Sequence, residues 1–309
     1  MQGGRKTAMT AAMFAAKDQG GMTTAADVTI VAVTFNSTAV LQPMLASVPA
    51  GTPVVLVDNA SGDTANLAQL ARAAGARIIQ NAQNMGFGAA CNQGAASAQT
   101  EFLLFLNPDA RLDPGALALL INAARQYPAA SAFNPALIDD DGHVRFKRHS
   151  DLLPGQKMPR GLPKVDTEVT VLVGAALLVR RAAFEKVGGF DENIFLYYED
   201  DDISLRLSQS CGPLMVIPAA IVRHARGASS GTGTDVSSFK AQHLGQARVY
   251  ALRKHGIPFA RTRSVATALR KLTNPVLLWR AGEAQARLAF LRGVVAGSMQ
   301  AQPRPKEPS

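Results

Sequence analysis

Short apolar runs alternate with helical segments along residues 28–138. The first run, residues 28–34, is rich in β-branched residues and predicts a strand buried on both faces of a sheet. The same alternation predicts further strands at 53–57, 77–80, 101–106 and 132–138, and helices at 37–48, 64–74, 88–98 and 114–126, the last with Pro114 in its first turn. Strands and helices that alternate at this spacing form right-handed β–α–β units, so the pattern predicts an α/β fold with a doubly wound sheet.

The pattern is less regular beyond residue 138. It predicts a tight turn at 139–142, a mobile proline-rich loop at 150–164 and a flexible Gly- and Ser-rich loop at 227–235. Between these loops it predicts a long strand at 169–179 interrupted at Gly174 and Ala175, a short helix at 181–187 closed by Gly188 and Gly189, a helix at 200–209 and a last strand at 214–217. Residues 237–255 and 261–296 are predicted to be helical, with a break at Asn274 and Pro275.

These patterns divide the 309 residues into four parts. Residues 1–26 are expected to be a disordered extension, 27–235 an α/β domain, 236–298 a basic amphipathic helical region and 299–309 a disordered tail. Cys91 and Cys211 are too few for a disulfide framework, so we expect both to be reduced, as in a cytosolic protein. No uncharged apolar run reaches about 18 residues, so no transmembrane helix is expected.

The formal net charge of +9 is unevenly distributed along the chain. Residues 240–309 contain thirteen Lys and Arg against two acidic residues, whereas residues 1–239 contain nineteen against twenty-one. The basic end allows three interpretations: a nucleic-acid site, contact with an anionic membrane surface, or a merely solvated face. Nucleic-acid binding would need base-stacking aromatic residues in the basic segment, and Trp279 and Phe290 are the only ones within 261–296, so we expect no nucleic-acid partner.

Polar clusters follow three of the predicted strands. Thr34 and Asn36 follow the first strand, Asp58 follows the second, and Asn107 and Asp109 follow the strand at 101–106. Ligands of open α/β sheets bind at the carboxyl ends of the strands, so these side chains are expected to meet. A carboxylate there can accept hydrogen bonds from a ribose or a base edge, or bind Mg²⁺ or Mn²⁺ that bridges to phosphates. Each cluster taken alone would be no more than a turn or a helix cap.

The densest acidic cluster is the run of four carboxylates at 199–202, which follows an aromatic run at a predicted helix start. Capping is the structural alternative, because carboxylates are favoured at a helix N-terminus. Four in a row exceed what capping needs, and mutual repulsion can raise one pKa into the working range of a general base. His224, just after the last predicted strand, is a candidate metal ligand beside Asp109, although a lone histidine is more often structural.

Seven blocks of sequence, taken together, resemble glycosyltransferase family 2, which has the GT-A nucleotide-sugar-binding fold, and within it the bacterial rhamnosyltransferase-like branch. The blocks lie in order, and the resemblance, which covers about residues 28–230, ends at His224. They are VAVTFNS at 31–37, VDNASGD at 57–63, NMGFGAACNQG at 84–94, LNPD at 106–109, GAALLVR at 174–180, GGFDE at 188–192 and FLYYEDDD at 195–202.

The resemblance implies an inverting transfer of a sugar from a nucleotide donor by single displacement. Asp200 is then the general base, and Asp109, at the last position of the family's Asp-x-Asp motif, binds Mg²⁺ or Mn²⁺ with His224 as the second protein ligand. Asn107 replaces the first acidic residue of that motif, which removes a charge, so it is assigned to the donor site. The donor-binding residues implied are Thr34, Asn36, Asp58, Asn84, Gly86, Phe87, Asn92 and Asn107.

The resemblance also implies a role in bacterial cell-surface glycan assembly, such as O-antigen or cell-wall synthesis, with a polyprenyl-diphosphate-linked or glycan acceptor. The preferred donor is dTDP-L-rhamnose, and UDP-galactofuranose, UDP-GlcNAc and UDP-glucose are alternatives because Asp58 suits thymine and uracil alike. A non-catalytic nucleotide- or glycan-binding module is the alternative of another class, but pure binding has no use for a general base. A Rossmann-type dehydrogenase is disfavoured because no G-x-G-x-x-G opens the first helix.

The basic end carries an apolar stripe. Val265, Leu269, Leu272, Val276 and Trp279 follow a 4-3-4-3 spacing, which places them on one face of a helix. A basic amphipathic helix with a tryptophan suits the surface of an anionic bilayer, here the inner face of the cytoplasmic membrane. The alternative is that the stripe packs on the enzyme's own core or on a second copy in a homodimer, and the sequence favours neither.

Overall fold

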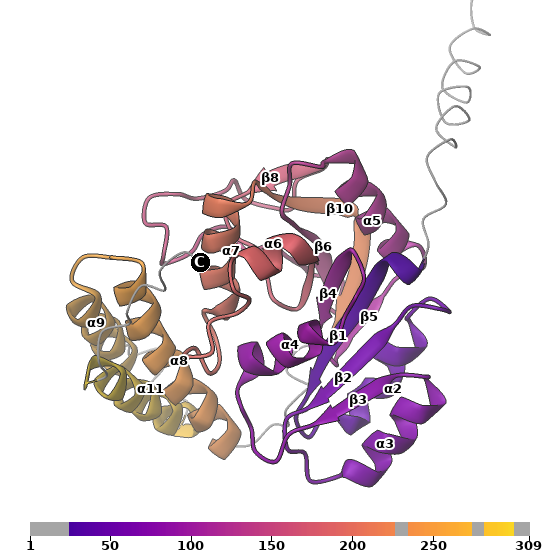
Figure 1. The fold of residues 1–309 in the computed structure, drawn as a ribbon. Helices are drawn as coiled ribbons and strands as arrows, with labels where there is room; N and C mark the ends of the chain where they lie inside the picture. Colours follow the sequence, from indigo (N-terminus) through magenta and orange to yellow (C-terminus); the bar gives the residue numbers. More distant parts are fainter. Residues whose placement is uncertain (1–24, 226–233, 274–280, 300–309) are drawn as a thin grey trace, which may run out of the picture.

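The computed structural model describes residues 25–225, 234–273 and 281–299 of the chain. After a short 3₁₀ turn at Ala25–Asp27, these residues form one sheet of ten strands with helices on both faces (Figure 1). The main path of the sheet runs β3-β2-β1-β4-β9-β6-β10-β5, and β7 and β8 pair with β6 and β10. The predicted α/β class with a doubly wound mixed sheet is confirmed.

One half of the sheet is parallel and follows the predicted elements closely. Its strands are β1 (Val28–Thr34), β2 (Val54–Asp58), β3 (Arg77–Gln80) and β4 (Phe102–Leu106). Successive residues of β1 alternate between two apolar cores: Ile30 and Ala32 pack on one face of the sheet, and Val31 and Val33 on the other. Burial on both faces explains why β1, β2 and β4 consist almost entirely of apolar residues.

The other half contains antiparallel pairs and departs from the predicted elements. Its strands are β5 (Ala110–Leu112), β6 (Ala132–Ile138), β7 (Val144–Arg145), β8 (Thr167–Val169), β9 (Ala176–Arg180) and β10 (Leu214–His224). The single strand predicted at 169–179 is wrong, because β8 pairs with β10 while β9 pairs with β4 and β6. Residues 170–175 cross between them, and the Asn134 side chain fixes this crossing by bonding the backbone of Val173 and Ala176.

The last strand was predicted to end at Ile217. In the structure this strand, β10, continues to His224. Pro218 interrupts the apolar run because it has no N–H for a ladder, and the structure accommodates it in a register shift between Ile217 and Ile221. The extension matters for the site, because it carries His224 to β5, where it pairs with Ala110. β5 and β7 were not predicted, since two or three residues show no periodicity.

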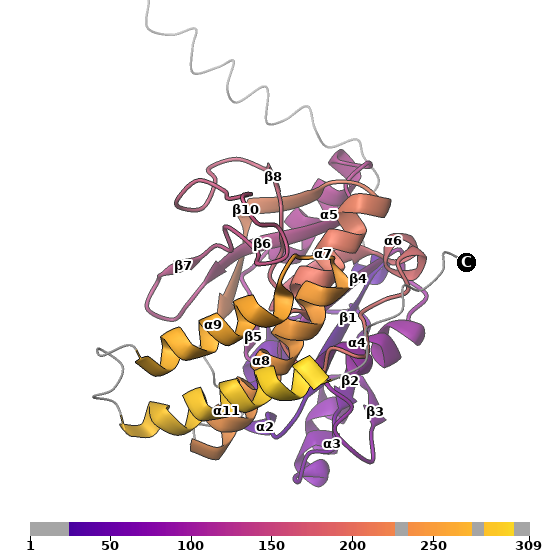
Figure 2. The ribbon, with the colours of Figure 1, turned by 90° about the vertical axis from the view of Figure 1, so that its left-hand side faces the viewer.

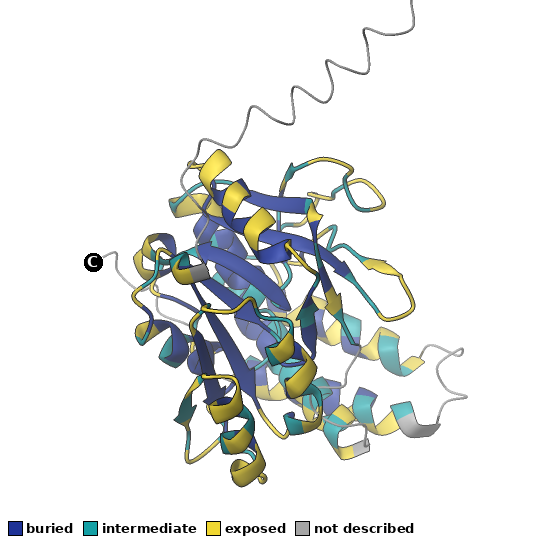
Figure 3. Cartoon of the chain, turned by 90° about the vertical axis from the view of Figure 1, so that its right-hand side faces the viewer, coloured by how far each residue is buried: buried dark blue, intermediate teal, exposed yellow. Residues whose placement is uncertain are grey.

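Helices cover both faces of the sheet, with buried strands inside and exposed residues on the outer sides of the helices (Figure 3). One face is covered by α2 (Thr38–Ala46), α3 (Thr64–Ala73) and α5 (Ala116–Gln126), and the other by α4 (Phe87–Ala96), α6 (Arg181–Lys186) and α7 (Glu199–Ser210). α4 packs so closely on the sheet that an added Cβ at Gly94 would lie 2.4 Å from Val31 Cγ1. The glycine therefore allows this close approach. α5 begins after Gly115, so the placement of Pro114 in its first turn is wrong.

Three further helices confirm the predicted C-terminal helical extension. They are α8 (Thr234–Lys254), α9 (Ala260–Thr273) and α11 (Ala281–Met299). α8 packs beside α7, where Leu205 shares an apolar cluster with Ala251 and Leu252, and α9 and α11 lie side by side away from the sheet (Figures 1 and 2). The predicted break at 274–275, most of the loop predicted at 227–235, and most of both predicted disordered ends lie outside the described residues.

Two residues of the apolar stripe, Val265 and Leu269, are exposed on α9, and a third, Leu272, is half-buried. α9 packs through Ala260, Ser264 and Ala268, which are buried, whereas Val265 and Leu269 are 37% and 51% exposed. The alternative in which the stripe packs on the enzyme's own core is therefore wrong at these two positions. Its last two residues lie outside the described part of the chain. Across the described ranges, no helix is long and apolar enough to cross a membrane.

Candidate active site

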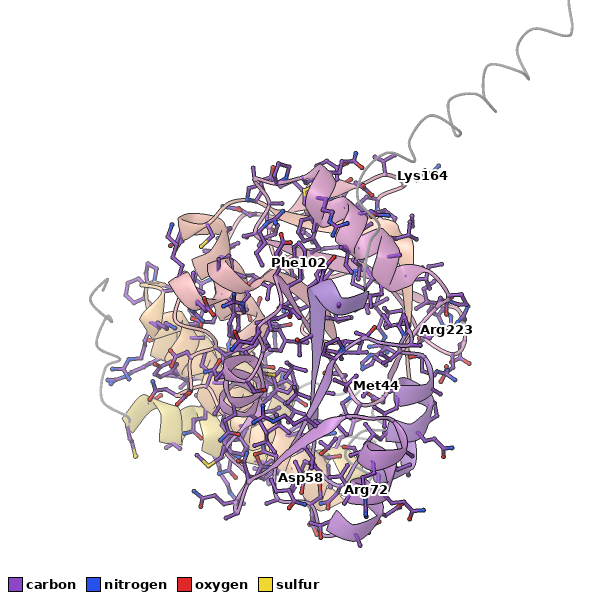
Figure 4. The ribbon with its side chains drawn as sticks, turned by 45° about the vertical axis from the view of Figure 1, so that its right-hand side comes forward. Met44, Asp58, Arg72, Phe102, Lys164 and Arg223 are labelled. Carbon is purple, nitrogen blue, oxygen red and sulfur yellow. The ribbon has the colours of Figure 1, made fainter. Side chains whose placement is uncertain are left out.

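The predicted donor-site residues lie along the carboxyl end of the parallel half of the sheet. Thr34 and Asp58 are register partners at the ends of β1 and β2, and Asn107 directly follows β4, which flanks β1 on its other side. Figure 4 shows Asp58 at the opposite end of the sheet from Phe102, the first residue of β4. The structure thus brings these side chains to the end where open α/β sheets bind ligands.

Asp58 is buried and held in one orientation. The residue is 1% exposed, and its Oδ1 accepts hydrogen bonds from the Ser61 N–H at 3.1 Å and the Thr34 hydroxyl at 3.4 Å. Asn36 belongs to the same turn, because its N–H donates to Ser61 Oγ and its Oδ1 accepts from the Gly62 N–H, both at 2.9 Å. No described residue donates to Asp58 Oδ2, which leaves that oxygen to accept a hydrogen bond from a ligand.

A loop carrying Asn84, Gly86 and Phe87 is tied to this turn by Asn59. The Asn59 Nδ2 donates to Asn84 Oδ1 at 2.8 Å and to the Gly86 carbonyl at 3.1 Å. Gly86 has a φ of +87°, and an added Cβ would lie 2.6 Å from the Phe195 carbonyl oxygen, so no other residue fits there. The Phe87 N–H donates to that same oxygen at 2.9 Å. The loop therefore links the Asp58 turn to the segment that precedes the acidic run.

Asn92 lies further along α4, away from that loop. Its Nδ2 donates to the Phe190 carbonyl and to Glu192 Oε1, both at 3.0 Å, and its Oδ1 accepts from the Phe190 N–H at 2.9 Å. The amide therefore anchors residues 189–192 against α4. Its contact with a donor stays a prediction.

Asn107, Asp109 and His224 meet where β4, β5 and β10 come together. Asp109 is 4% exposed, and its Oδ1 lies 3.2 Å from His224 Nε2 and accepts no hydrogen bond from a described residue. Asn107 Nδ2 lies 3.4 Å from the same nitrogen. A buried carboxylate oxygen without a donor, beside an imidazole nitrogen, is a ligand set suited to a divalent cation. These residues fit the predicted Mg²⁺ or Mn²⁺, and Asp109 and His224 would hold it.

A second group of potential ligands lies at the turn before β7. Asp139, Asp141 and His143 offer atoms within 4.8 Å of one another. Asp141 and His143 are exposed, and Asp139 Oδ1 already accepts the His143 N–H at 2.8 Å. The hydrogen bonds of the turn account for this cluster, which contains none of the predicted ligands.

Asp200 lies in the first turn of α7, with its side chain 17% exposed. Its Oδ2 accepts from the Gly174 N–H at 3.3 Å and from Lys147 Nζ at 2.9 Å, and its Oδ1 accepts from the Asp201 N–H at 2.9 Å. Ala175, next to Gly174, accepts the N–H of Asn107 at 2.9 Å. This series of contacts leads from Asp200 to the end of β4, and so to the group formed by Asn107, Asp109 and His224.

The neighbouring carboxylates have different surroundings. Burial, together with repulsion from Asp200, raises the pKa of Glu199 to about 8 and that of Asp201 to about 6. Glu199 is therefore harder to ionise than a solvent-exposed glutamate. Asp202 is fully buried among cationic side chains of α7 and α8. The four acidic residues thus share a helix turn but not a chemical state.

Two residues that support the site were not predicted. Asn59 directly follows Asp58 in the block at 57–63. Its position next to a predicted donor-site residue was the only sequence feature that could have identified it. Lys147 bonds Asp200 across 53 residues of sequence, from an irregular segment that carries no motif. Only the folded chain brings it to the acidic run.

Comparison with known proteins identifies the family of this chain. The family model described as "Glycosyl transferase family 2" matches residues 29–188. The N-acetylglucosaminyl-diphospho-decaprenol L-rhamnosyltransferase of Mycobacterium tuberculosis is 31% identical over 262 residues, which cover 73% of this chain and 84% of that protein.

Two solved structures support the fold. GalNAc-T7 with UDP, GalNAc and Mn²⁺ has a TM-score of 0.59 at 16% identity, covering 87% of this chain and 56% of that one. The mannosyltransferase PcManGT from Pyrobaculum calidifontis, in complex with GDP-Man and Mn²⁺, has a TM-score of 0.54 at 15% identity, covering 88% and 87%. This chain is a glycosyltransferase with the GT-A fold, and it belongs to the rhamnosyltransferase-like branch of glycosyltransferase family 2.

Proposed function

We propose that this enzyme transfers L-rhamnose from dTDP-L-rhamnose, with inversion, to a polyprenyl-diphosphate-linked glycan at the inner face of the cytoplasmic membrane. The observation that carries the proposal is the series of contacts that joins Asp200, through Gly174 and Ala175, to the strand end that bears Asn107 and Asp109. A carboxylate beside a phosphate-binding strand end is what a single-displacement sugar transfer requires. The relative from M. tuberculosis, an N-acetylglucosaminyl-diphospho-decaprenol L-rhamnosyltransferase, supports the choice of sugar and acceptor.

Each group of the site has one task in this reaction. Asp58, with Thr34 and Asn36, accepts hydrogen bonds from the nucleobase, and the loop at 84–87 follows the nucleotide and sugar. Asp109 and His224 hold Mg²⁺ or Mn²⁺, which when bound neutralises charge on the diphosphate.

Asp200 takes the proton from the attacking hydroxyl. A new bond forms between that oxygen and the anomeric carbon while the bond to the nucleoside diphosphate breaks. The diphosphate leaves with the electron pair, so no covalent sugar–enzyme intermediate is needed.

The outer face of α9 supports the membrane location. Phe259, just before the helix, is 80% exposed, and Val265 and Leu269 on the helix are also exposed. Arg261, Arg263 and Arg270 are exposed on the same short helix. Apolar side chains flanked by arginines insert shallowly into an anionic bilayer, which would bring a lipid-linked acceptor to the enzyme.

The test is turnover of purified enzyme with a panel of dTDP- and UDP-sugars, Mg²⁺ or Mn²⁺, and polyprenyl-diphosphate-GlcNAc. We expect product from dTDP-L-rhamnose and none without the divalent cation. Asp200→Asn should bind nucleotide as the wild type does, seen as thermal stabilisation, but lose nearly all transfer. Asp140→Asn, at an exposed aspartate paired with Arg111, is the matched control and should keep full activity.

The outcomes separate the alternatives. Transfer from a UDP-sugar alone would reassign the donor and leave the mechanism intact. Full transfer by Asp200→Asn would remove the assigned base. Nucleotide binding without any transfer or hydrolysis would favour a binding module.

A further inference from the structure

Lys147 lies between two carboxylates of the acidic run. Its Nζ is 2.9 Å from Asp200 Oδ2 and 2.7 Å from Asp201 Oδ2, and its side chain is 25% exposed. The residue comes from the irregular segment that follows β7, whereas both aspartates are in the first turn of α7. A lysine immobilised by two charge-assisted hydrogen bonds loses much of its rotamer freedom. This arrangement differs from an exposed ion pair, whose side chains remain mobile.

Lys147 offsets negative charge on the carboxyl groups around Asp200. Glu199, Asp200 and Asp201 place three carboxyl groups within one helical turn, and Lys147 is the cation that bonds two of them. Other polar groups that face this cluster are the buried Cys91 thiol on α4, the Tyr197 hydroxyl and the Ser150 hydroxyl. None of these three is positively charged, so the loss of Lys147 would leave the carboxylates to repel one another.

We propose that Lys147 is a positioning residue for sugar transfer, which holds the Asp200 carboxylate in place and aimed at the acceptor hydroxyl. The inference rests on the proposed role of Asp200 as the base. Lys147 and the Gly174 N–H fix Oδ2, and the Asp201 N–H bonds Oδ1. The carboxylate is therefore held from both sides, and its remaining lone pairs receive the hydroxyl proton.

The pairing with Asp201 completes the arrangement. When Asp200 takes the proton from the acceptor it becomes neutral, and its attraction for Lys147 falls. Lys147 then keeps its bond to Asp201 and remains partnered, so the cation need not move during the transfer. Lys147 itself neither gives nor takes a proton, and its pKa is raised by Asp200 and Asp201 despite burial.

The experiment compares Lys147→Met, Lys147→Gln and Lys147→Arg with the wild type in pH profiles of kcat and KM. An adjacent cation lowers a carboxyl pKa by about one to three units, so the acidic limb of kcat should move up by about one to three pH units in the Met and Gln variants. Activity lost near neutral pH should return at alkaline pH, and the Arg variant should keep the wild-type limb. The KM for the donor should change little.

Lys164→Met is the matched control. Lys164 is an exposed lysine of the segment between β7 and β8, and Figure 4 shows it at the far edge of the molecule from Asp58. It should leave kcat, KM and the pH profile unchanged.

Soluble Met or Gln variants that keep the wild-type limb, at any level of kcat, overturn the proposal. If both fail to fold, a shifted acidic limb in Lys147→Arg overturns it instead. An inactive wild type, or a fully active Asp200→Asn, would refute the proposed function and not the placement of Lys147.

Discussion

Asp202 joins the acidic run to the C-terminal helices, and its removal gives a quantitative test of the fold. The residue is fully buried at 0% exposure. Its Oδ2 accepts from Arg206 Nε at 2.9 Å and Nη2 at 2.6 Å, and its Oδ1 lies 2.6 Å from Lys254 Nζ and 2.8 Å from His255 Nε2. Arg206 belongs to α7, whereas Lys254 ends α8 and His255 follows it. Asp202→Asn keeps the shape and removes the charge that these three groups share.

The expected loss of unfolding free energy depends on which partners the cations retain when the Asp202 charge is removed. Breaking a buried ion pair from one side costs about 3–5 kcal/mol, because it leaves uncompensated charge. Lys254 still has Asp191 Oδ2 at 2.7 Å, and Arg206 still donates to the carbonyls of Val187 and Gly189. We therefore expect the lower end of that range, about 3 kcal/mol of unfolding free energy.

The pH of the measurement is fixed by the carboxyl itself. Burial opposes the ionisation of Asp202, but His255, Arg206 and Lys254 outweigh it and hold its pKa well below the usual range. The folded pKa is thus depressed, so the stabilisation is present above the pKa of an unfolded aspartate and is lost only as the pH falls through the folded value. At pH 7 the whole contribution is measured.

The assay is equilibrium unfolding in urea at pH 7, followed by far-UV circular dichroism. Asp113→Asn is the matched control, because Asp113 pairs with Arg223 at the surface, where the side chains are 24% and 46% exposed. An exposed pair contributes about 0–1 kcal/mol. If Asp202→Asn loses no more free energy than Asp113→Asn, the buried network does not hold the C-terminal helices to α7.

Three further outcomes are expected. Glu199→Gln should be more stable than the wild type at pH 8 and above, with the difference fading toward about pH 4.5, because the raised pKa of Glu199 makes its ionisation unfavourable to folding; equal pH–stability curves would contradict this. Asp109→Asn and His224→Ala should each weaken Mn²⁺ binding by about tenfold or more, measured by calorimetry, whereas unchanged affinity would place the cation elsewhere. Leu269→Ser should reduce sedimentation with anionic liposomes at low salt without lowering the melting temperature, and unchanged sedimentation would count against the α9 face.

The sequence predicted the parallel half of the fold because burial there is nearly complete. β1, β2 and β4 are buried along their whole length, so their apolar runs predict strands even when the neighbouring strands are unknown. The antiparallel half depends on pairings between distant residues, such as Leu214 with Val169. The division of 169–179 into two strands follows from those pairings and from Asn134, and no local pattern carries that information.

The site divides in the same way. Thr34, Asp58 and Asn107 come to one edge because they end neighbouring parallel strands, which is a consequence of topology that alternation alone predicts. The extension of β10 past Pro218 was hidden by the proline, yet it is what sets His224 beside Asp109. The sequence predicts His224 as a candidate ligand with Asp109, but no local pattern shows how the chain brings the two side chains together.

The run of four carboxylates shows why a motif does not describe its own chemistry. Burial and repulsion from Asp200 raise the pKa of Glu199, while Asp202 is buried and ionised because cations of α7 and α8 surround it. Asp200 and Asp201 differ again, since both share Lys147. In the sequence these are four consecutive acidic residues at a helix start. In the helix, successive side chains point in different directions, so each one meets a different environment. Of the four, only Asp200 combines partial exposure with a link to the strand end that bears Asn107 and Asp109, and this is the physical reason to assign it the proton transfer.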